Sequence, residues 1–92
     1  MKYVLLGNLS DKWAAKQTLR VRNSRDKLSN LGITLEAVFY TQGEFDFVDI
    51  VEAPNSESVL AFSVWYAKQG YGRVRSLPAF DTRSMTKAMK KV

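Results

Sequence analysis

The spacing of apolar and polar residues predicts four β-strands. Four stretches are rich in β-branched and aromatic residues and end at turn formers: Lys2–Leu9, Ile33–Thr41, Phe45–Ala53 and Gly72–Phe80. In the second stretch a period of two assigns Ile33, Leu35, Ala37 and Phe39 to one face, and Thr34, Glu36, Val38 and Tyr40 to the other. A tight turn at Gln42-Gly43 would join the second strand to the third. Pro78 cannot donate a backbone hydrogen bond, so the last strand is expected at a sheet edge.

Two longer segments, residues 12–31 and 56–69, have helical periodicity. In the first, the apolar face comprises Trp13, Ala14, Gln17, Val21, Ser24, Leu28 and Leu31, with a possible interruption at Asn23 and an end at Gly32. In the second, the predicted core face comprises Val59, Leu60, Ser63, Val64 and Ala67. Phe62, Trp65 and Tyr66 then lie outside that face. We expect these aromatic residues to pack either against the last helix or in a subunit interface.

Residues 81–92 predict a short amphipathic helix with a basic side, which Asp81 or Thr82 would cap. Its apolar stripe comprises Met85, Ala88, Met89 and Val92, and its basic side comprises Arg83, Lys87, Lys90 and Lys91. A helix of this kind can bind a membrane or a protein partner. Because it is short and has no bulky anchor residue, we expect docking on its own domain or on a neighbouring subunit.

The order of these elements predicts an α+β fold of the ferredoxin-like type. It is βαββαβ, with an antiparallel four-stranded sheet in residues 1–80 and the short C-terminal helix in residues 81–92. Right-handed crossovers place the first and third strands in the middle and both long helices on one face. The other face of the sheet would be apolar and bare. We therefore expect the chain to bind itself through this open face, as a homodimer or a higher even oligomer.

Composition excludes several classes of chemistry. The 92 residues include no Cys and no His, so the chain offers no disulfide, thiol nucleophile or His-based metal site. We expect no metal and no cofactor. No apolar run is long enough for a membrane span, and no targeting signal is visible, so the expected compartment is the cytoplasm.

The net charge of +5 is unevenly distributed, with basic excess at the two ends and an acidic excess in residues 32–69. This asymmetry is compatible with nucleic-acid binding through Lys12, Lys16, Arg20, Lys27 and the C-terminal tail. It is equally compatible with complementary surfaces that meet within an oligomer. Because no basic run is dense and no pattern of base-stacking aromatic residues is present, the oligomer is the favoured interpretation.

The segment GEFDFVDIVEAP, residues 43–54, contains the candidate chemistry. Asp46 shares one strand face with Val48 and Ile50, and Asp49 shares the other with Phe47, so one of the two acids points under the helices or into the space between two paired sheets. Asp46 could be a carboxylate at the mouth of a pocket, with a raised pKa and the role of a base. It could instead accept hydrogen bonds from backbone amides of the hairpin or pair with an arginine, which is the favoured interpretation.

Several polar residues near the ends of the predicted strands are candidates for lining a ligand pocket. They are Tyr3, Asn8, Tyr40, Glu44, Asp46 and Arg75. Glu36, Glu44 and Asp46 could together attract a hard cation, although their spacing is unlike that of a calcium loop. The sequence does not identify catalytic residues.

The segments KYVLLGNLSD, FYTQGEFDFVDIVEAPNSES and GRVRSLPAF resemble the GYD-domain family, over about residues 2–80. The Gly-x-Tyr-Asp pattern of that family falls on Gly43, Glu44, Phe45 and Asp46, with Phe45 in place of tyrosine. The resemblance implies a dimeric α+β barrel, in which two sheets pair face to face. Proteins of that kind include cofactor-independent monooxygenases, haem enzymes and ligand-binding regulatory domains, so the fold alone does not determine the function.

Three functional hypotheses follow. The favoured one is a homo-oligomeric module that binds a small ligand or has a regulatory role, with its pocket between the sheet and the helices. The alternative is a metal-free, cofactor-independent enzyme, similar to a monooxygenase or an isomerase, that uses Asp46, Tyr40 or the chemistry of the bound substrate itself. Nucleic-acid binding is the least favoured.

Overall fold

The computed structural model describes all 92 residues, apart from the side chain of Trp13. The predicted place of Trp13 on an apolar helix face therefore lies outside the described residues. The strands are β1 (Lys2–Leu9), β2 (Thr34–Tyr40), β3 (Phe47–Glu52) and β4 (Gly72–Ala79). The helices are a 3₁₀ helix, η1 (Asp11–Lys16), and the α-helices α1 (Gln17–Asn30), α2 (Ser56–Lys68) and α3 (Thr82–Met89).

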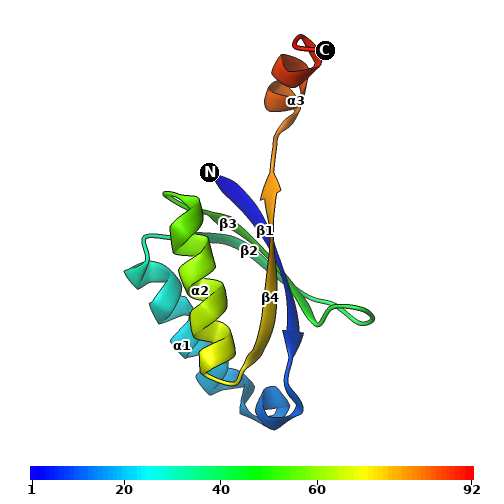
Figure 1. Ribbon diagram of the computed structural model, residues 1–92. Coiled ribbons are helices and arrows are strands. Elements are labelled where there is room, and N and C mark those ends of the chain that lie inside the picture. Colours follow the sequence, from blue (N-terminus) through cyan, green and yellow to red (C-terminus); the bar gives the residue numbers. More distant parts are fainter.

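The four strands form one antiparallel sheet with the order β2-β3-β1-β4, which confirms the ferredoxin-like α+β prediction. β1 pairs with β3 from Lys2↔Glu52 to Gly7↔Phe47, and with β4 from Lys2↔Ala79 to Leu9↔Gly72. β4 is an edge strand, as Pro78 predicted. α1 and α2 cover one face of the sheet and leave the other open (Figure 1).

The core between α2 and the sheet is aromatic, and this corrects the predicted orientation of α2. Phe62 and Tyr66 are buried, with 1% and 2% exposed, whereas Leu60 and Val64 are 64% and 58% exposed. The Tyr66 ring lies 5.9 Å from that of Phe47 and 5.4 Å from that of Tyr71. α2 has one apolar stripe with Phe62 and Tyr66 and another with Leu60 and Val64. The aromatic stripe faces the sheet because larger side chains remove more surface from water. Phe62 and Tyr66 are therefore core residues of this domain, and Trp65 packs partly buried against them.

A β-bulge in β2 corrects the predicted strand faces. Leu35 pairs with Val51, but the next residue of β3, Ile50, pairs with Ala37, so Glu36 is an extra residue. The bulge reverses the alternation after Leu35. Leu35, Val38 and Tyr40 consequently face the helices, and Ala37 and Phe39 face the open side of the sheet.

The segment before α1 also differs from the predicted single helix. Residues 11–16 form a 3₁₀ helix, which has about three residues per turn, so the predicted apolar face fails at its start, where Ala14 and Gln17 are exposed. Its later members, Val21, Ser24, Leu28 and Leu31, face the cavity or the core as predicted. Arg20 is buried, with 3% exposed, rather than part of an exposed basic stripe. Asn23 does not interrupt α1, and its Nδ2 donates to the Tyr71 hydroxyl at 2.9 Å. Gly32, with φ of 73°, follows the helix end as predicted.

The β2–β3 hairpin has a longer loop than the predicted two-residue turn. β3 begins at Phe47, two residues after the predicted start, because Asp46 and its neighbours close the loop. The Thr41 amide donates to the Asp46 carbonyl at 2.9 Å, and the Thr41 hydroxyl donates to the Phe45 carbonyl at 2.6 Å.

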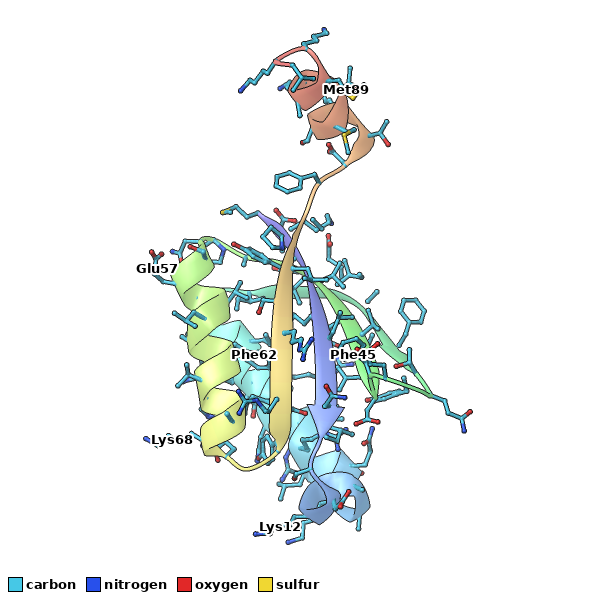
Figure 2. All side chains as sticks on the ribbon, turned by 45° about the vertical axis from the view of Figure 1, so that its right-hand side comes forward. Lys12, Phe45, Glu57, Phe62, Lys68 and Met89 are labelled. Carbon is cyan, nitrogen blue, oxygen red and sulfur yellow. The ribbon has the colours of Figure 1, made fainter. Side chains whose placement is uncertain are left out.

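α3 stands away from the domain at the end of β4 (Figure 1). Asp81 caps it by accepting a hydrogen bond from the Ser84 amide at 2.8 Å, as one predicted alternative had it. No side chain of α3 is buried in the described structure. Figure 2 shows Met89 in this arm and Lys12 at the opposite end of the molecule. Docking of this helix on its own domain, one of the two predicted placements, therefore does not occur.

Candidate ligand-binding pocket

A small cavity of about 40 Å³ lies under α1, on the helix side of the sheet. Its walls come from four elements: Arg20, Val21, Ser24, Arg25 and Leu28 of α1, Leu35, Val38 and Tyr40 of β2, Phe47 and Asp49 of β3, and Phe62 and Tyr66 of α2. The cavity is largely apolar with a few convergent polar groups, which is the composition of small-molecule sites. The bulge at Glu36 helps to form it, because it turns Val38 and Tyr40 toward α1.

Asp49 is the unusual residue of this cavity. It is only 8% exposed, and its carboxyl group accepts no hydrogen bond from any group that the structure describes. Burial raises the pKa of Asp49 to about 6, although the positive charges of Arg25 and Arg20 oppose this rise. The carboxyl group of Asp49 therefore titrates close to neutral pH at the cavity wall.

Two further polar side chains of α1 accompany Asp49. The Arg20 guanidinium is buried, donates to the Gln17 side-chain oxygen and acts electrostatically on Tyr66. Burial raises the pKa of Tyr66 well above its ordinary value, although the positive charge of Arg20 lowers it, so the Tyr66 hydroxyl keeps its proton. The Ser24 hydroxyl is buried and has no hydrogen-bond partner within the described structure. The cavity wall thus contains one fully buried polar atom without a partner, the Ser24 hydroxyl, beside the nearly buried carboxyl group of Asp49.

An outer groove of about 480 Å³ runs along α1. Val21, Arg25 and Tyr40 line both the groove and the cavity, so the two spaces adjoin at these side chains. Arg25 is exposed there and makes no hydrogen bond or ion pair within the described residues. A ligand could therefore place one end in the cavity and extend along the groove.

Only one predicted site residue, Tyr40, lines this cavity. Tyr3 is 5% exposed and belongs to the hydrophobic core. The other four, Asn8, Glu44, Asp46 and Arg75, lie near the β2–β3 loop and on the open side of the sheet. Their role in ligand binding stays a prediction.

The four residues near the loop have structural contacts. Asn8 Nδ2 donates to the Glu44 carbonyl at 2.7 Å, and the Arg75 guanidinium lies 5.8 Å from the centre of the Phe45 ring. The Asp46 carboxylate accepts a hydrogen bond from the Leu9 amide at 2.7 Å. Asp46 therefore ties the hairpin to the end of β1, as the structural interpretation of this residue predicted, although the donor belongs to β1 rather than to the hairpin.

The acidic residues considered for a hard cation lie apart. Glu36 pairs with Lys2 at the bulge, and Asp46 bonds to Leu9, so these carboxylates do not converge with Glu44. No group of three or more acidic side chains suited to a metal ion occurs among the described residues. The basic stripe considered for nucleic acid is also broken, since Arg20 is buried beside Tyr66.

Sequence reasoning noted that one of the two acids would point under the helices, and the structure identifies it as Asp49. The sequence placed Ser24 on the inward face of the helix but did not indicate it as a site residue, and it did not indicate Arg20 or Arg25 there. The available signal was their spacing: Arg20 and Ser24 are four residues apart and therefore share a helix face with Leu28. An arginine is expected on the inner face of α1 only once Asp49 of β3 is known to lie across the cavity from it.

The fold is a ferredoxin-like α+β domain with a small cavity under α1. A sequence profile of the GYD domain matches residues 3–89, and the chain belongs to the GYD domain family. The match extends past residue 80 and includes α3. A search of curated proteins gave no match. None of the helices that the structure describes has both the length and the hydropathy to cross a membrane.

Asp49 should make the stability of the fold depend on pH. Its pKa is raised from 3.8 to about 6 on folding, so between these values the folded state holds a proton that the unfolded state has released. Stability should therefore fall as pH rises through this interval, by up to ~3 kcal/mol. Urea denaturation of the wild type and of Asp49→Asn from about pH 4 to about pH 8 measures the effect. The difference between their free energies of unfolding at each pH isolates Asp49, because the other carboxyl groups contribute equally to both proteins. A difference between the two proteins that does not vary with pH would contradict the assignment.

Proposed function

We propose that this protein is a homo-oligomeric module that binds a small molecule in the pocket under α1. The observation that carries the proposal is the buried carboxyl group of Asp49, which has no hydrogen-bond partner among the described groups and lies on the wall of a cavity. A ligand with complementary polar atoms would satisfy both this group and the Ser24 hydroxyl. The aromatic and aliphatic side chains of the cavity wall would bury the apolar atoms next to the ligand's polar end.

A fragment screen by amide NMR tests the pocket directly. Fragments that bind should shift the amide signals of Ser24, Arg25 and Asp49, which surround the cavity. The signals of β4 should change little, because no residue of β4 lines the cavity. A screen in which no fragment affects the first group, or in which all hits map to the open sheet face, would contradict the proposed site.

The open face of the sheet supports the oligomeric part of the proposal. It presents apolar side chains from all four strands: Val4, Leu6, Ala37, Phe39, Val48, Ile50 and Leu77. Phe39 and Leu77 are 61% and 49% exposed. A contiguous apolar patch of this kind usually marks an interaction surface. A second copy of the same sheet would cover it with matching shape and hydrophobicity.

The arm formed by Phe80 and α3 fits the same assembly. It has a basic side and exposed apolar residues, including Phe80 at 77% and Met89 at 64%. Three acidic residues are available on that side of the sheet. Glu36 lies at the bulge, Glu44 in the hairpin loop and Glu52 on the open face of β3. An arm that reaches across to a second copy would bring its basic side toward these residues.

Phe39→Lys should prevent this assembly. A charge placed on the apolar face would have to be desolvated in the interface, so the oligomer should dissociate at micromolar concentration. Leu60→Lys is the matched control, because Leu60 is similarly exposed but lies on the outer side of α2. Light scattering coupled to size exclusion should give an even oligomer for the wild type and the control, and a monomer for Phe39→Lys. An oligomer that survives Phe39→Lys but is lost in Leu60→Lys would assign the interface to the helices instead.

The second candidate function is a cofactor-independent enzyme of the dimeric-barrel kind. The observation in its favour is again Asp49, because a buried carboxyl group with a pKa of about 6 is suited to accept a proton from a bound substrate near neutral pH. This role falls to Asp49 rather than to Asp46, whose carboxylate is occupied by the Leu9 amide. Recovery of a bound molecule unchanged after incubation with the protein favours the binding module, and its conversion favours the enzyme.

A further inference from the structure

The charges around the cavity determine which ligands it can accept. The ionisable groups that face Asp49 are Arg20 and Arg25 from α1, Tyr66 from α2 and Tyr40 from β2. The two guanidinium groups stay positive, and only one carboxyl group opposes them. A cationic ligand would be repelled by both arginines, whereas an anion would offset the excess positive charge.

The size of the cavity limits what enters it. One water molecule needs at least roughly 10–15 Å³, and a cavity that holds benzene measures about 150 Å³. The cavity of about 40 Å³ therefore has room for a group of a few atoms, such as a carboxylate, but not for a ring or a long chain. The rest of the ligand must lie in the outer groove, which is about ten times larger by the same measure, at 480 Å³.

The hydrogen-bonding groups select among small head groups. Arginine donates in a fixed fork that matches a carboxylate, and Arg25 has no other ion pair among the described residues. The buried Ser24 hydroxyl can donate to the same head group. Asp49 in its protonated form can donate as well, whereas its ionised form would repel a carboxylate. A carboxylate thus satisfies all three groups at once, provided that Asp49 carries a proton.

We propose that the pocket binds a small organic acid, with its carboxylate in the cavity between Arg25, Ser24 and a protonated Asp49, and its apolar body in the groove past Val21 and Tyr40. This inference rests on the proposed function and specifies the ligand class of the same site. Binding then includes the uptake of one proton from solvent by Asp49 when the free protein is ionised. The affinity for the acid should consequently weaken as pH rises above about 6.

Calorimetric titration with hexanoate and phenylacetate, and with the corresponding neutral amides, tests the ligand class. At about pH 5 the acids should bind at least ~10-fold more tightly than the amides, because the amides lose the charge-assisted hydrogen bonds. Raising the pH to about 8 should weaken binding of the acids by ~10-fold or more and leave the amides unchanged. Acids that bind no better than amides, or that bind equally at both pH values, would overturn the inference.

Three variants test the residues. Asp49→Asn keeps the shape and a donor but removes the charge, so at about pH 8 it should bind the acids ~10-fold more tightly than the wild type, with no dependence on pH. Arg25→Gln should weaken binding of the acids by ~10-fold. Lys68→Gln is the control, since it makes the same change in net charge at an exposed position that lines neither space, and it should have no effect.

The outcomes separate this inference from the proposed function. If fragments bind at the pocket but the acids show no preference over the amides, the ligand class is wrong and the binding module stands. If neither acids, amides nor fragments shift the amide signals of Ser24 and Asp49, both fail. Acids whose affinity responds equally to Arg25→Gln and Lys68→Gln would indicate general charge attraction, which also overturns the inference.

Discussion

Phe62→Ala should destabilise the fold by ~3–5 kcal/mol, the usual cost of removing a buried aromatic ring from a core. Phe62 is 1% exposed, and its ring lies 5.7 Å from that of Trp65 and 5.8 Å from that of Tyr66. Figure 2 shows it on α2, the helix whose ends are marked by Glu57 and Lys68. Small domains commonly have only ~5–15 kcal/mol of stability, so this loss should be plain in urea denaturation.

Leu60→Ala on the same helix is the matched control. Leu60 is 64% exposed, so its truncation should change the free energy of unfolding by less than ~0.5 kcal/mol. The pair tests which side of α2 faces the sheet, because the apolar pattern alone predicts the opposite ranking. A larger loss for Leu60→Ala than for Phe62→Ala would mean that the helix is rotated from the orientation described.

Gly72→Ala should cost at least ~3 kcal/mol, because it combines backbone strain with a collision. The φ angle of Gly72 is 150°, in a region that residues with a Cβ rarely adopt. A Cβ added there would lie 1.9 Å from the Asn8 carbonyl oxygen, and this oxygen belongs to the neighbouring strand β1. Backbone atoms inside a paired sheet cannot move aside without breaking the ladder.

Gly43→Ala separates the two contributions. Gly43 has a similar φ angle of 138°, but a Cβ there would meet no atom within 4 Å. It should therefore cost only the ~1–3 kcal/mol of the backbone conformation. Thermal denaturation of both variants measures the difference. Equal losses would show that the contact between Gly72 and β1 is looser than described.

Much of the fold follows from local patterns. β1 begins and ends at the predicted residues, because its strongly apolar run ends at the polar residues Asn8 and Ser10. The helix ends at Gly32 and Asp81 were also predictable, since a glycine with positive φ and an Asp cap act through adjacent backbone groups. The strand order followed from the handedness of the crossovers.

Other features depend on contacts between distant segments, which periodicity does not encode. α2 has two apolar stripes, and the choice of Phe62 and Tyr66 over Leu60 and Val64 depends on the space above the sheet. The bulge at Glu36 reverses the faces of β2 without any glycine or proline to mark it.

The candidate site depends on these two features, so the sequence located it only in part. Tyr40 was a predicted site residue, but only the bulge turns it toward α1. Asp49 was recognised as an acid on the face of Phe47, whereas the burial of Arg20 near it was not predicted. An arginine is usually exposed, and the favourable interaction with a carboxylate and a tyrosine opposite becomes visible only in three dimensions.

Native mass spectrometry of the freshly purified chain, followed by the same sample denatured, tests the central claim most directly. The account predicts an even oligomer that carries extra mass, and this mass should be released on denaturation as a small molecule. If the ligand is an acid, incubating the protein with it at about pH 5 should increase the fraction of protein that carries the extra mass. A monomer without extra mass, in a protein whose spectrum shows it to be folded, would contradict both the assembly through the open sheet face and the ligand pocket under α1.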